Sequence, residues 1–452
     1  MQIIIVGCGK IGNSITQKLS QEGHNVTVID LDNSIVQTTS TQYDVMGVIG
    51  NGASYSVQQE AGIAETDLLI AVTASDEVNL LCCLIAKKAG NCSTIARVRN
   101  PIYNAELSFI KEELGLSMSI NPEFSAATEI ARLLRFPSAI KIDTFAKGRV
   151  ELLKFRIPDN SPLNQCTISN ISKNIGCDIL ICAIERGDEV ITPNGNTTLY
   201  AKDLVSFVAS PQNASRFFKK IKIETHQVHN TIIVGGGKIA FYLAEQLIRS
   251  GISVKIIEKN LARCELLTEQ LPSATIINGD ATNQELLLEE GLAHSESFVS
   301  LTDMDEENIV LSLFAKKSSK AKVITKVNKI SFDNVIRDFD LGSLVHPKQI
   351  VADNITSYVR AMQNSIGSNI ETLYNIIDNK AEALEFIIRK NSPVIGIPLE
   401  KLNIRDHILV ACITRKKSII IPRGKDMIQE GDTVIIVTTH TGLHDIKDIL
   451  KD

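Results

Sequence analysis

The chain opens with MQIIIVGCGKIGNSITQKLSQEGHNVTVID, residues Met1–Asp30. An apolar run of strand length leads into glycines with G-x-G-x-x-G spacing. A segment of helical character follows, and a second apolar run ends in an acid. A strand, a tight turn, a helix, a strand and an acid in this order are typical of a nucleotide-binding βαβ unit. The stretch therefore predicts a Rossmann-like nucleotide site. The alternative is a flavodoxin-like turn that binds no ligand.

Each glycine of the turn has its own physical role. Gly7 permits backbone angles that other residues resist, Gly9 lets the backbone approach a pyrophosphate, and Gly12 lets the helix pack close to the strand. The helix N-terminus offers free N–H groups and a partial positive charge to a phosphate. Asp30 stands where a carboxylate accepts hydrogen bonds from two ribose hydroxyls.

Length and composition limit the classes of protein to which the chain can belong. Its 452 residues suggest two to four domains at about 150 residues each. A net charge of −5, no tryptophan and no basic stripe give no support for nucleic-acid binding. The first residues enter a predicted strand without a signal-peptide pattern, and no apolar run is long enough to span a bilayer. We expect a soluble protein without direct membrane insertion, whose membrane role comes through a partner.

The nine cysteines are scattered, without a C-x-x-C pair and without Cys/His spacing for a metal. They indicate reduced thiols packed as small apolar groups in the cytosol, and we predict no metal site. Cys8 lies inside the glycine turn, where it is either redox-sensitive or a small residue that fills the turn; the second interpretation is favoured.

Strands and helices alternate after Asp30 in a rhythm typical of a doubly wound parallel sheet. The pattern predicts further strands at residues 45–49, 67–72, 94–98 and 117–120, and an amphipathic helix over Pro122–Leu134 that leaves the sheet. Short strand-like runs separated by Pro, Gly and Asn turns follow. They predict a second, smaller α+β domain.

The same pattern starts again at Asn230. Superposing the two halves pairs Gly7 with Gly235, Gly9 with Gly237, Gly12 with Ala240 and Asp30 with Glu258, and it aligns Gly52-Ala53-Ser54 with Asp280-Ala281-Thr282. The chain is therefore predicted to be an α/β protein: a tandem duplication of a doubly wound, parallel-sheet Rossmann-like domain followed by a small α+β domain. The expected boundaries are 1–136 and 228–366 for the Rossmann-like domains, and 137–225 and 367–452 for the small domains.

Ligands of open parallel sheets bind beyond the carboxyl ends of the strands, so the loops at that edge supply the candidate site. In repeat one the candidates are Gly7, Cys8, Gly9, Lys10, Ile11, Gly12, Asp30, Gly52, Ala53, Thr73 and Arg97. In repeat two they are Gly235, Gly237, Lys238, Ala240, Glu258, Asp280, Ala281, Thr302 and Lys326. No catalytic residue is predicted in either set.

The cations among these candidates have two interpretations each. Arg97 at the end of the fifth strand neutralises a phosphate or is a surface arginine, and phosphate binding is favoured. Lys10 and Lys238 follow the second glycine of each turn; they reach a terminal phosphate or are solvated residues at a helix start, and the second is slightly favoured.

The acid at the end of the second strand of each repeat indicates which dinucleotide the site can bind. Asp30 and Glu258 both suit a ribose diol, and the residues directly after them, Leu31 and Lys259, are not arginine. A 2′-phosphate would also clash with the acid, which argues against NADP. Asp280 is placed to accept from the adenine amino group, so we expect repeat one, with Gly52 there, to bind its base through less polar contacts.

These motifs resemble those of the regulatory-subunit family of the Trk potassium-uptake system, over the whole chain. The features that carry the resemblance are IIIVGCGKIG…VID, GNGAS, AVTASDEVN, ARVRN and NPEFSAATEIARLLRF, with IIVGGGKIA…IIEKN, INGDAT and SLTDMDEEN in the second half. The resemblance implies NAD(H) and ATP/ADP as ligands and a homo-oligomeric ring, a dimer or tetramer of chains, at the inner face of the cell membrane. It also implies docking on a TrkH- or TrkG-type potassium transporter. Gly52 is the departure, since the family usually has Asp there.

Two other functions remain open at this stage. An NAD-dependent dehydrogenase would need a proton-transfer group near the nicotinamide. None of the eight histidines recurs at a matching position or lies in a cleft loop: His24, His226, His229, His294, His346, His407, His440 and His444. A regulatory subunit of a potassium channel or an efflux antiporter is the third possibility, although most such subunits carry one repeat.

Overall fold

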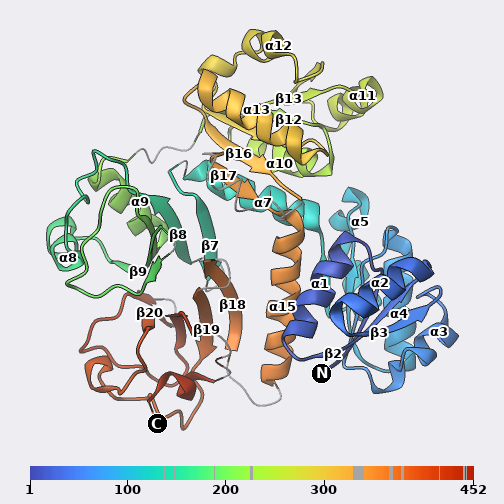
Figure 1. The fold of residues 1–452 in the computed structure, drawn as a ribbon, viewed down its shortest axis with the longest axis horizontal. Coiled ribbons are helices and arrows are strands. Elements are labelled where there is room, and N and C mark those ends of the chain that lie inside the picture. The colour runs from blue at the N-terminus through green and yellow to red at the C-terminus, as the bar shows by residue number, and fades with distance from the viewer. Residues whose placement is uncertain are drawn as a thin grey trace. The chain divides into compact units, whose positions relative to one another are not determined.

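The computed structural model describes residues 1–136, 138–145, 149–187, 189–223, 228–328, 341–365, 370–377, 381–416, 418–440, 443 and 445–451. The chain forms two compact units (Figure 1). The first contains Met1–Thr128 and His346–Thr356, and the second contains Glu129–Val345 and Ser357–Asp452.

The first Rossmann-like domain is a six-stranded sheet of order β3-β2-β1-β4-β5-β6, and every neighbouring pair is parallel. Its strands are β1 Gln2–Val6, β2 Asn25–Asp30, β3 Met46–Ile49, β4 Leu68–Ala71, β5 Ser93–Arg97 and β6 Met118–Ile120. Its helices are α1 Lys10–Gln21, α2 Asn33–Tyr43, α3 Tyr55–Glu60, α4 Asp76–Ala89, α5 Pro101–Ala105 and α6 Leu107–Glu113. The apolar residues of β1, β4 and β5 are buried, as expected of strands covered on both faces, whereas the edge strand β3 exposes Met46 and Ile49.

The second Rossmann-like domain repeats this order as β14-β13-β12-β15-β16-β17, again with parallel neighbours. Its strands are β12 Asn230–Val234, β13 Ser253–Glu258, β14 Thr275–Asn278, β15 Ser297–Ser300, β16 Lys322–Lys326 and β17 Ser343–Val345. Its helices in the described residues are α10 Lys238–Arg249, α11 Leu261–Gln270, α12 Gln284–Glu289 and α13 Asp305–Ser318. In both sheets the strand order reverses beside the first strand, so the glycine turn lies at the topological switch point, where open parallel sheets bind ligands.

Each small domain is an antiparallel five-stranded sheet, in agreement with the predicted duplication. The first has the order β10-β9-β11-β8-β7 and the second has the corresponding order β21-β20-β22-β19-β18. The first comprises β7 Lys141–Phe145, β8 Val150–Arg156, β9 Ile179–Arg186, β10 Glu189–Ile191 and β11 Leu204–Ala209, with α8 Ile168–Ile175 and α9 Pro211–Lys220. The second comprises β18 Ile370–Ile377, β19 Ala381–Ile387, β20 Ile408–Arg415, β21 Ser418–Ile420 and β22 Thr433–Thr438. Residues of both sheets, among them Cys182 and Cys412, share one apolar core.

Two linker helices, α7 Pro122–Arg135 and α15 Pro347–Ser365, follow the last strand of each Rossmann-like sheet. Both helices are divided between the two units. Within the first unit, Lys18 on α1 forms an ion pair with Asp353 on α15. Within the second unit, Arg135 pairs with the buried Glu151, which ties the end of α7 to the first small sheet.

The sequence alignment of the third loop is wrong by one residue. The N–H of Gly50 donates to the carbonyl of Asp30 (2.9 Å), and the N–H of Gly279 donates to the carbonyl of Glu258 (3.0 Å). Gly50 therefore corresponds to Gly279, Asn51 to Asp280 and Gly52 to Ala281. The extra residue of repeat two lies before β14, because the connection from α11 to β14 is longer than that from α2 to β3.

Among the described residues, no helix has the length and apolar character needed to cross a bilayer. In the same part of the chain, no group of three or more His, Cys, Asp and Glu side chains is arranged to hold a metal ion.

Candidate nucleotide sites

The glycine turn of repeat one is closed by contacts that exclude side chains. Gly7 has φ +99°, and a Cβ built there would lie 2.9 Å from the backbone nitrogen of Thr73. A Cβ on Gly12 would collide with the carbonyl oxygen of Gly7. Gly9 is the N-cap of α1 and has no side chain to satisfy the first N–H groups of the helix. These groups are therefore available to a phosphate, as the sequence predicts.

The acid at the end of the second strand is bound to the glycine turn in both repeats. The Asp30 Oδ2 atom accepts from the N–H of Cys8 (2.7 Å) and Oδ1 accepts from the N–H of Asp32 (3.1 Å). In repeat two, Glu258 Oε2 accepts from Gly236 (2.6 Å) and Oε1 accepts from Asn260 (2.7 Å). Both carboxylates are half-buried, and each oxygen retains acceptor capacity for a ribose hydroxyl.

The third loop brings Asn51 or Asp280 to the same edge. The Asn51 side-chain oxygen accepts from the N–H of Ala53 (3.0 Å). Asp280 Oδ1 accepts from the N–H (2.9 Å) and the hydroxyl (2.7 Å) of Thr282, and these bonds lower the pKa of Asp280. The contrast between the repeats is thus an amide against a carboxylate, not a glycine against an aspartate. A Cβ on Gly52 would lie 2.1 Å from a methyl carbon of the Val6 side chain, whereas the corresponding residue of repeat two is the buried Ala281.

An asparagine holds the fourth loop in place in both repeats. Asn79 Oδ1 accepts from the N–H of Thr73 (2.8 Å), and its Nδ2 donates to the carbonyl of Arg97 (3.0 Å). Asn308 makes the same two bonds to Thr302 (2.8 Å) and Lys326 (3.1 Å). Because the Cβ positions of Gly7 and Gly235 abut residues 73 and 302, the first and fourth loops are in direct contact. All four predicted loops of each repeat therefore converge.

Arg97 and Lys326 lie at this edge but are engaged by the protein. The Arg97 guanidinium donates to the carbonyl of Thr73, and burial, with a further contribution from Arg99, lowers its pKa. Lys326 Nζ lies 3.4 Å from the carbonyl of Leu301 and 3.7 Å from Asp303. A guanidinium has five N–H donors and an ammonium has three, so one carbonyl contact leaves donors on each side chain, and phosphate binding by Arg97 stays a prediction.

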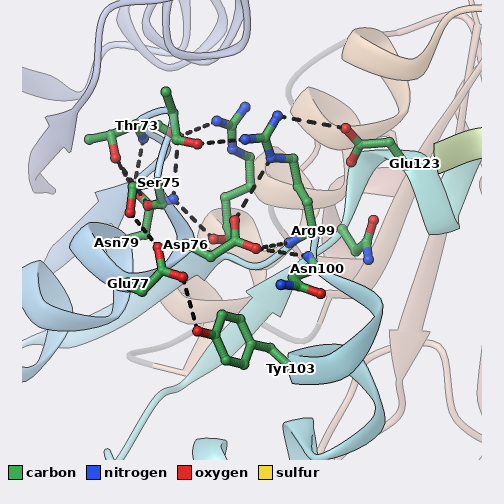
Figure 2. A network of polar contacts seen from close by, with 12 residues as sticks. Thr73, Ser75, Asp76, Glu77, Asn79, Arg99, Asn100, Tyr103 and Glu123 are labelled. Atoms are coloured by element: carbon green, nitrogen blue, oxygen red, sulfur yellow. Dashed lines mark hydrogen bonds and ion pairs between the residues drawn. The ribbon is translucent and has the colours of Figure 1, made fainter. Parts of the chain in front are cut away.

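A polar network beyond the predicted residues surrounds the fourth loop of repeat one (Figure 2). Asp76 Oδ2 accepts from the N–H groups of Arg99 and Asn100, both at 2.8 Å. Arg99 lies 3.9 Å from Glu123, the second residue of α7. Ser75 rather than Asp76 is the N-cap of α4, because its hydroxyl accepts from the N–H of Val78 (3.2 Å). The sequence signal for this network was the pair of arginines in ARVRN.

The remaining candidates of the glycine turn are simpler. Lys10 and Lys238 are exposed at the start of α1 and α10, and within the described part of the chain no hydrogen bond or ion pair is recorded for either side chain. Cys8 is buried, and burial together with the charge of Asp30 raises its pKa to about 12. A thiol with this pKa stays protonated at neutral pH, which favours the interpretation of Cys8 as a packing residue.

No histidine of the described residues lies in the four loops of either repeat. The described histidines are His24, His229, His294, His346, His407 and His440; His226 and His444 lie outside the described residues. The site geometry thus brings together backbone donors, carboxylate acceptors and cations, the groups that a nucleotide site requires, and the described residues place no imidazole among them.

Two Rossmann-like domains with converging nucleotide loops, each followed by a small antiparallel sheet, define a class of tandem nucleotide-binding proteins. The TrkA-N domain family matches residues 3–122 and 231–347, and the TrkA-C domain family matches residues 152–222 and 383–451. The chain belongs to the TrkA family of Trk system potassium uptake proteins.

Relatives and solved structures agree with this assignment. The chain is 31% identical to the Trk system potassium uptake protein TrkA of Haemophilus influenzae over 443 residues, which cover 96% of this chain and 95% of that protein. It is 30% identical to a TrkA homolog of Archaeoglobus fulgidus over 100% of both chains. The GsuK channel bound to NAD has a TM-score of 0.63 at 17% identity, over 97% of this chain and 76% of that chain. The GsuK RCK domain has a TM-score of 0.63 at 18% identity, and the match covers 96% of this chain and 92% of that chain. These structures share the fold.

Proposed function

We propose that this protein is the cytosolic nucleotide-sensing subunit of a potassium uptake system, docked at the inner face of the membrane on a TrkH- or TrkG-type transporter. Binding of NAD(H) or of ATP/ADP in the Rossmann-like sites would alter the gating of that transporter. The observation that carries the proposal is the repetition of one site architecture in both halves, with a glycine turn, a ribose acid and an asparagine-held loop in each.

The ligand class follows from the contacts at the sheet edge. A half-buried carboxylate beside a glycine turn and an uncapped helix N-terminus suits the ribose and phosphates of an adenine nucleotide. Solved structures of this fold include GsuK bound to NAD and GsuK bound to ADP, which supports both classes of ligand as candidates. A ligand acts as a signal only if it binds two conformations of the protein with different affinity.

We propose a homo-oligomeric ring, a dimer or tetramer of chains, as the active assembly. Leu81 on α4 and Val310 on α13 occupy equivalent positions, and their side chains are 46% and 65% exposed. An apolar side chain kept on the surface in both copies suits an interface that both copies use. A dehydrogenase is disfavoured as an alternative because the small domains would have to supply its acid–base residues.

Two measurements test this function together. The purified chain should bind NADH, NAD, ATP or ADP in calorimetry and should not oxidise NADH in the presence of small metabolites. Cells that lack the gene and any redundant uptake system should grow poorly at low potassium. Robust substrate-dependent turnover of NADH, or normal potassium uptake in such cells, would overturn the proposal.

A further inference from the structure

The two sites differ in charge beside the ribose acid. The residue after the acid is Leu31 in repeat one and Lys259 in repeat two. Four positions further, on the first turn of α2 or α11, stand Ile35 and Arg263. Leu31 is 74% exposed and Ile35 is 37% exposed, so in repeat one apolar groups face solvent where repeat two has cations.

Arg263 is fixed against the glycine turn of repeat two. Its Nε atom donates to the carbonyl of Gly236 at 2.6 Å, and the N–H of the same glycine donates to Glu258 at 2.6 Å. The Arg263 guanidinium is therefore bonded to the carbonyl of Gly236, and the Glu258 carboxylate is bonded to the N–H of the same glycine. Hydrogen bonds from the Nη atoms of Arg263 are not recorded within the described residues, and the side chain is half-buried. These donors are available to an anion on the ribose.

Lys259 adds a second cation at the same edge. It is exposed, and its charge contributes to the low pKa of Asp280 after the two bonds from Thr282. The cations thus offset the carboxylates of Glu258 and Asp280.

In repeat one the corresponding positions, residues 30–35, carry only negative charge. The carboxylates are Asp30 and Asp32, and Asp32 caps α2 where repeat two has the neutral Asn260. Leu31 and Ile35 offer no compensating charge. A dianionic group placed there would meet uncompensated repulsion, which falls off slowly over a few ångströms.

We propose that the repeat-two site accepts adenine dinucleotides with a phosphate on the adenosine 2′-oxygen, NADP(H), as well as NAD(H), whereas the repeat-one site excludes them. Arginine beside the ribose accommodates a 2′-phosphate in this fold, and a lone acid rejects it. The clash between a 2′-phosphate and the acid, which argues against NADP, applies fully in repeat one, whereas in repeat two Lys259 and Arg263 offset the charge of Glu258. The inference rests on the proposed nucleotide-binding function and adds a ligand to one of its two sites.

The test uses the full chain with one site disabled at a time. Asp30→Ala weakens the site of repeat one, so binding is measured at repeat two, and Glu258→Ala does the reverse. Each variant is titrated with NADH and with NADPH by fluorescence and calorimetry. For the Asp30→Ala chain, we expect the Kd for NADPH to lie within about 10-fold of the Kd for NADH. For the Glu258→Ala chain, we expect NADPH to bind at least about 100-fold more weakly than NADH.

Exchange of the charged residues isolates their contribution. Adding Lys259→Leu and Arg263→Ile to the Asp30→Ala chain should weaken NADPH about 10- to 100-fold and NADH by less than about threefold. The reciprocal Leu31→Lys and Ile35→Arg changes in the Glu258→Ala chain should improve NADPH binding. Arg263→Lys, which keeps the charge, should give an intermediate loss, and it serves if Arg263→Ile does not fold.

The possible results separate the two claims. If repeat two binds NADH but rejects NADPH, or if the exchanged variants bind NADPH unchanged, this inference fails and the nucleotide-sensing function stands. If neither isolated repeat binds NADH or adenine nucleotides, the proposed function fails with it.

Discussion

Arg99 and Glu123 join the nucleotide edge of repeat one to its linker helix: Nη1 of Arg99 lies 3.9 Å from Oε1 of Glu123 (Figure 2). Arg99 also donates to the carbonyl of Ala74 in the fourth loop at 2.5 Å. The corresponding residues of repeat two are Asn328 and Lys348, which cannot form this ion pair. A phosphate that recruits Arg99 in repeat one would therefore compete directly with the first turn of α7.

Glu123→Gln should strengthen ATP binding to repeat one. The change removes a carboxylate that competes with the phosphates for Arg99, and because the pair is partly exposed the gain should be at most about fivefold, about 1 kcal/mol. Calorimetry of the Glu258→Ala chain with and without Glu123→Gln measures the effect. AMP, which lacks the distal phosphates, is the control ligand and should bind equally to both; weaker ATP binding would show that Glu123 does not compete for Arg99.

Asp30→Ala should weaken nucleotide binding to repeat one by about 10- to 100-fold, because it removes charged hydrogen bonds to the ribose. The change also frees the N–H of Cys8, to which Asp30 is bonded at 2.7 Å. Glu60→Gln on α3 is the matched control, since it removes a carboxylate away from the glycine turn. Unchanged affinity of repeat one in the Asp30→Ala chain would remove the ribose assignment.

Leu81→Asp together with Val310→Asp should lower the molar mass measured by light scattering, because each places a charge on a surface that the ring would bury. Both side chains are exposed in the single chain, so the change should leave the fold intact. Leu266→Asp, also at an exposed apolar position, provides the control. If the doubly substituted chain keeps the wild-type mass, α4 and α13 are not the ring interface.

The buried thiol of Cys8 should make stability fall at alkaline pH. Burial and Asp30 raise its pKa from 9.0 to about 12, so the folded chain holds a proton that the unfolded chain loses above pH 9. The stabilisation is complete below pH 9 and is lost progressively up to about pH 12. Between pH 8 and pH 10, urea unfolding should show that wild type loses about 1.4 kcal/mol more than Cys8→Ala. An identical pH dependence in the two proteins would mean that the thiol ionises within the fold.

Much of the fold was predictable because its local signals agree with one another. The apolar runs, the glycine spacing and the acid at Asp30 indicate the same βαβ unit, and the second half repeats them with Ala240 in place of the third glycine and Glu258 in place of the aspartate. The first strand of the small domain, β7 Lys141–Phe145, is not among the predicted strands, because its two apolar residues, Ile142 and Phe145, are three positions apart and do not give the alternation typical of a strand.

The site was predictable to the level of its loops and not of its contacts. Sequence spacing could not tell on which side of β14 the extra residue lies, so Asn51 was passed over in favour of Gly52. Backbone hydrogen bonds to Asp30 and Glu258 resolve that alignment. Arg263 was missed because it is 27 residues from Gly236 in the sequence, and only the fold brings its Nε atom to the carbonyl of that glycine. The engagement of Arg97 by the carbonyl of Thr73 likewise depends on a rotamer, which sequence does not specify.

The central claim is that nucleotide occupancy of the two Rossmann-like sites controls potassium flux. Its most direct test is potassium or rubidium flux into vesicles that contain the partner transporter, measured with this protein across a titration of NADH and of ATP. We expect the flux to change with nucleotide concentration when the wild-type chain is present. With the chain that combines Asp30→Ala and Glu258→Ala, we expect the flux to be independent of nucleotide. Flux that ignores nucleotide in wild type, or that responds equally in the double variant, would contradict it.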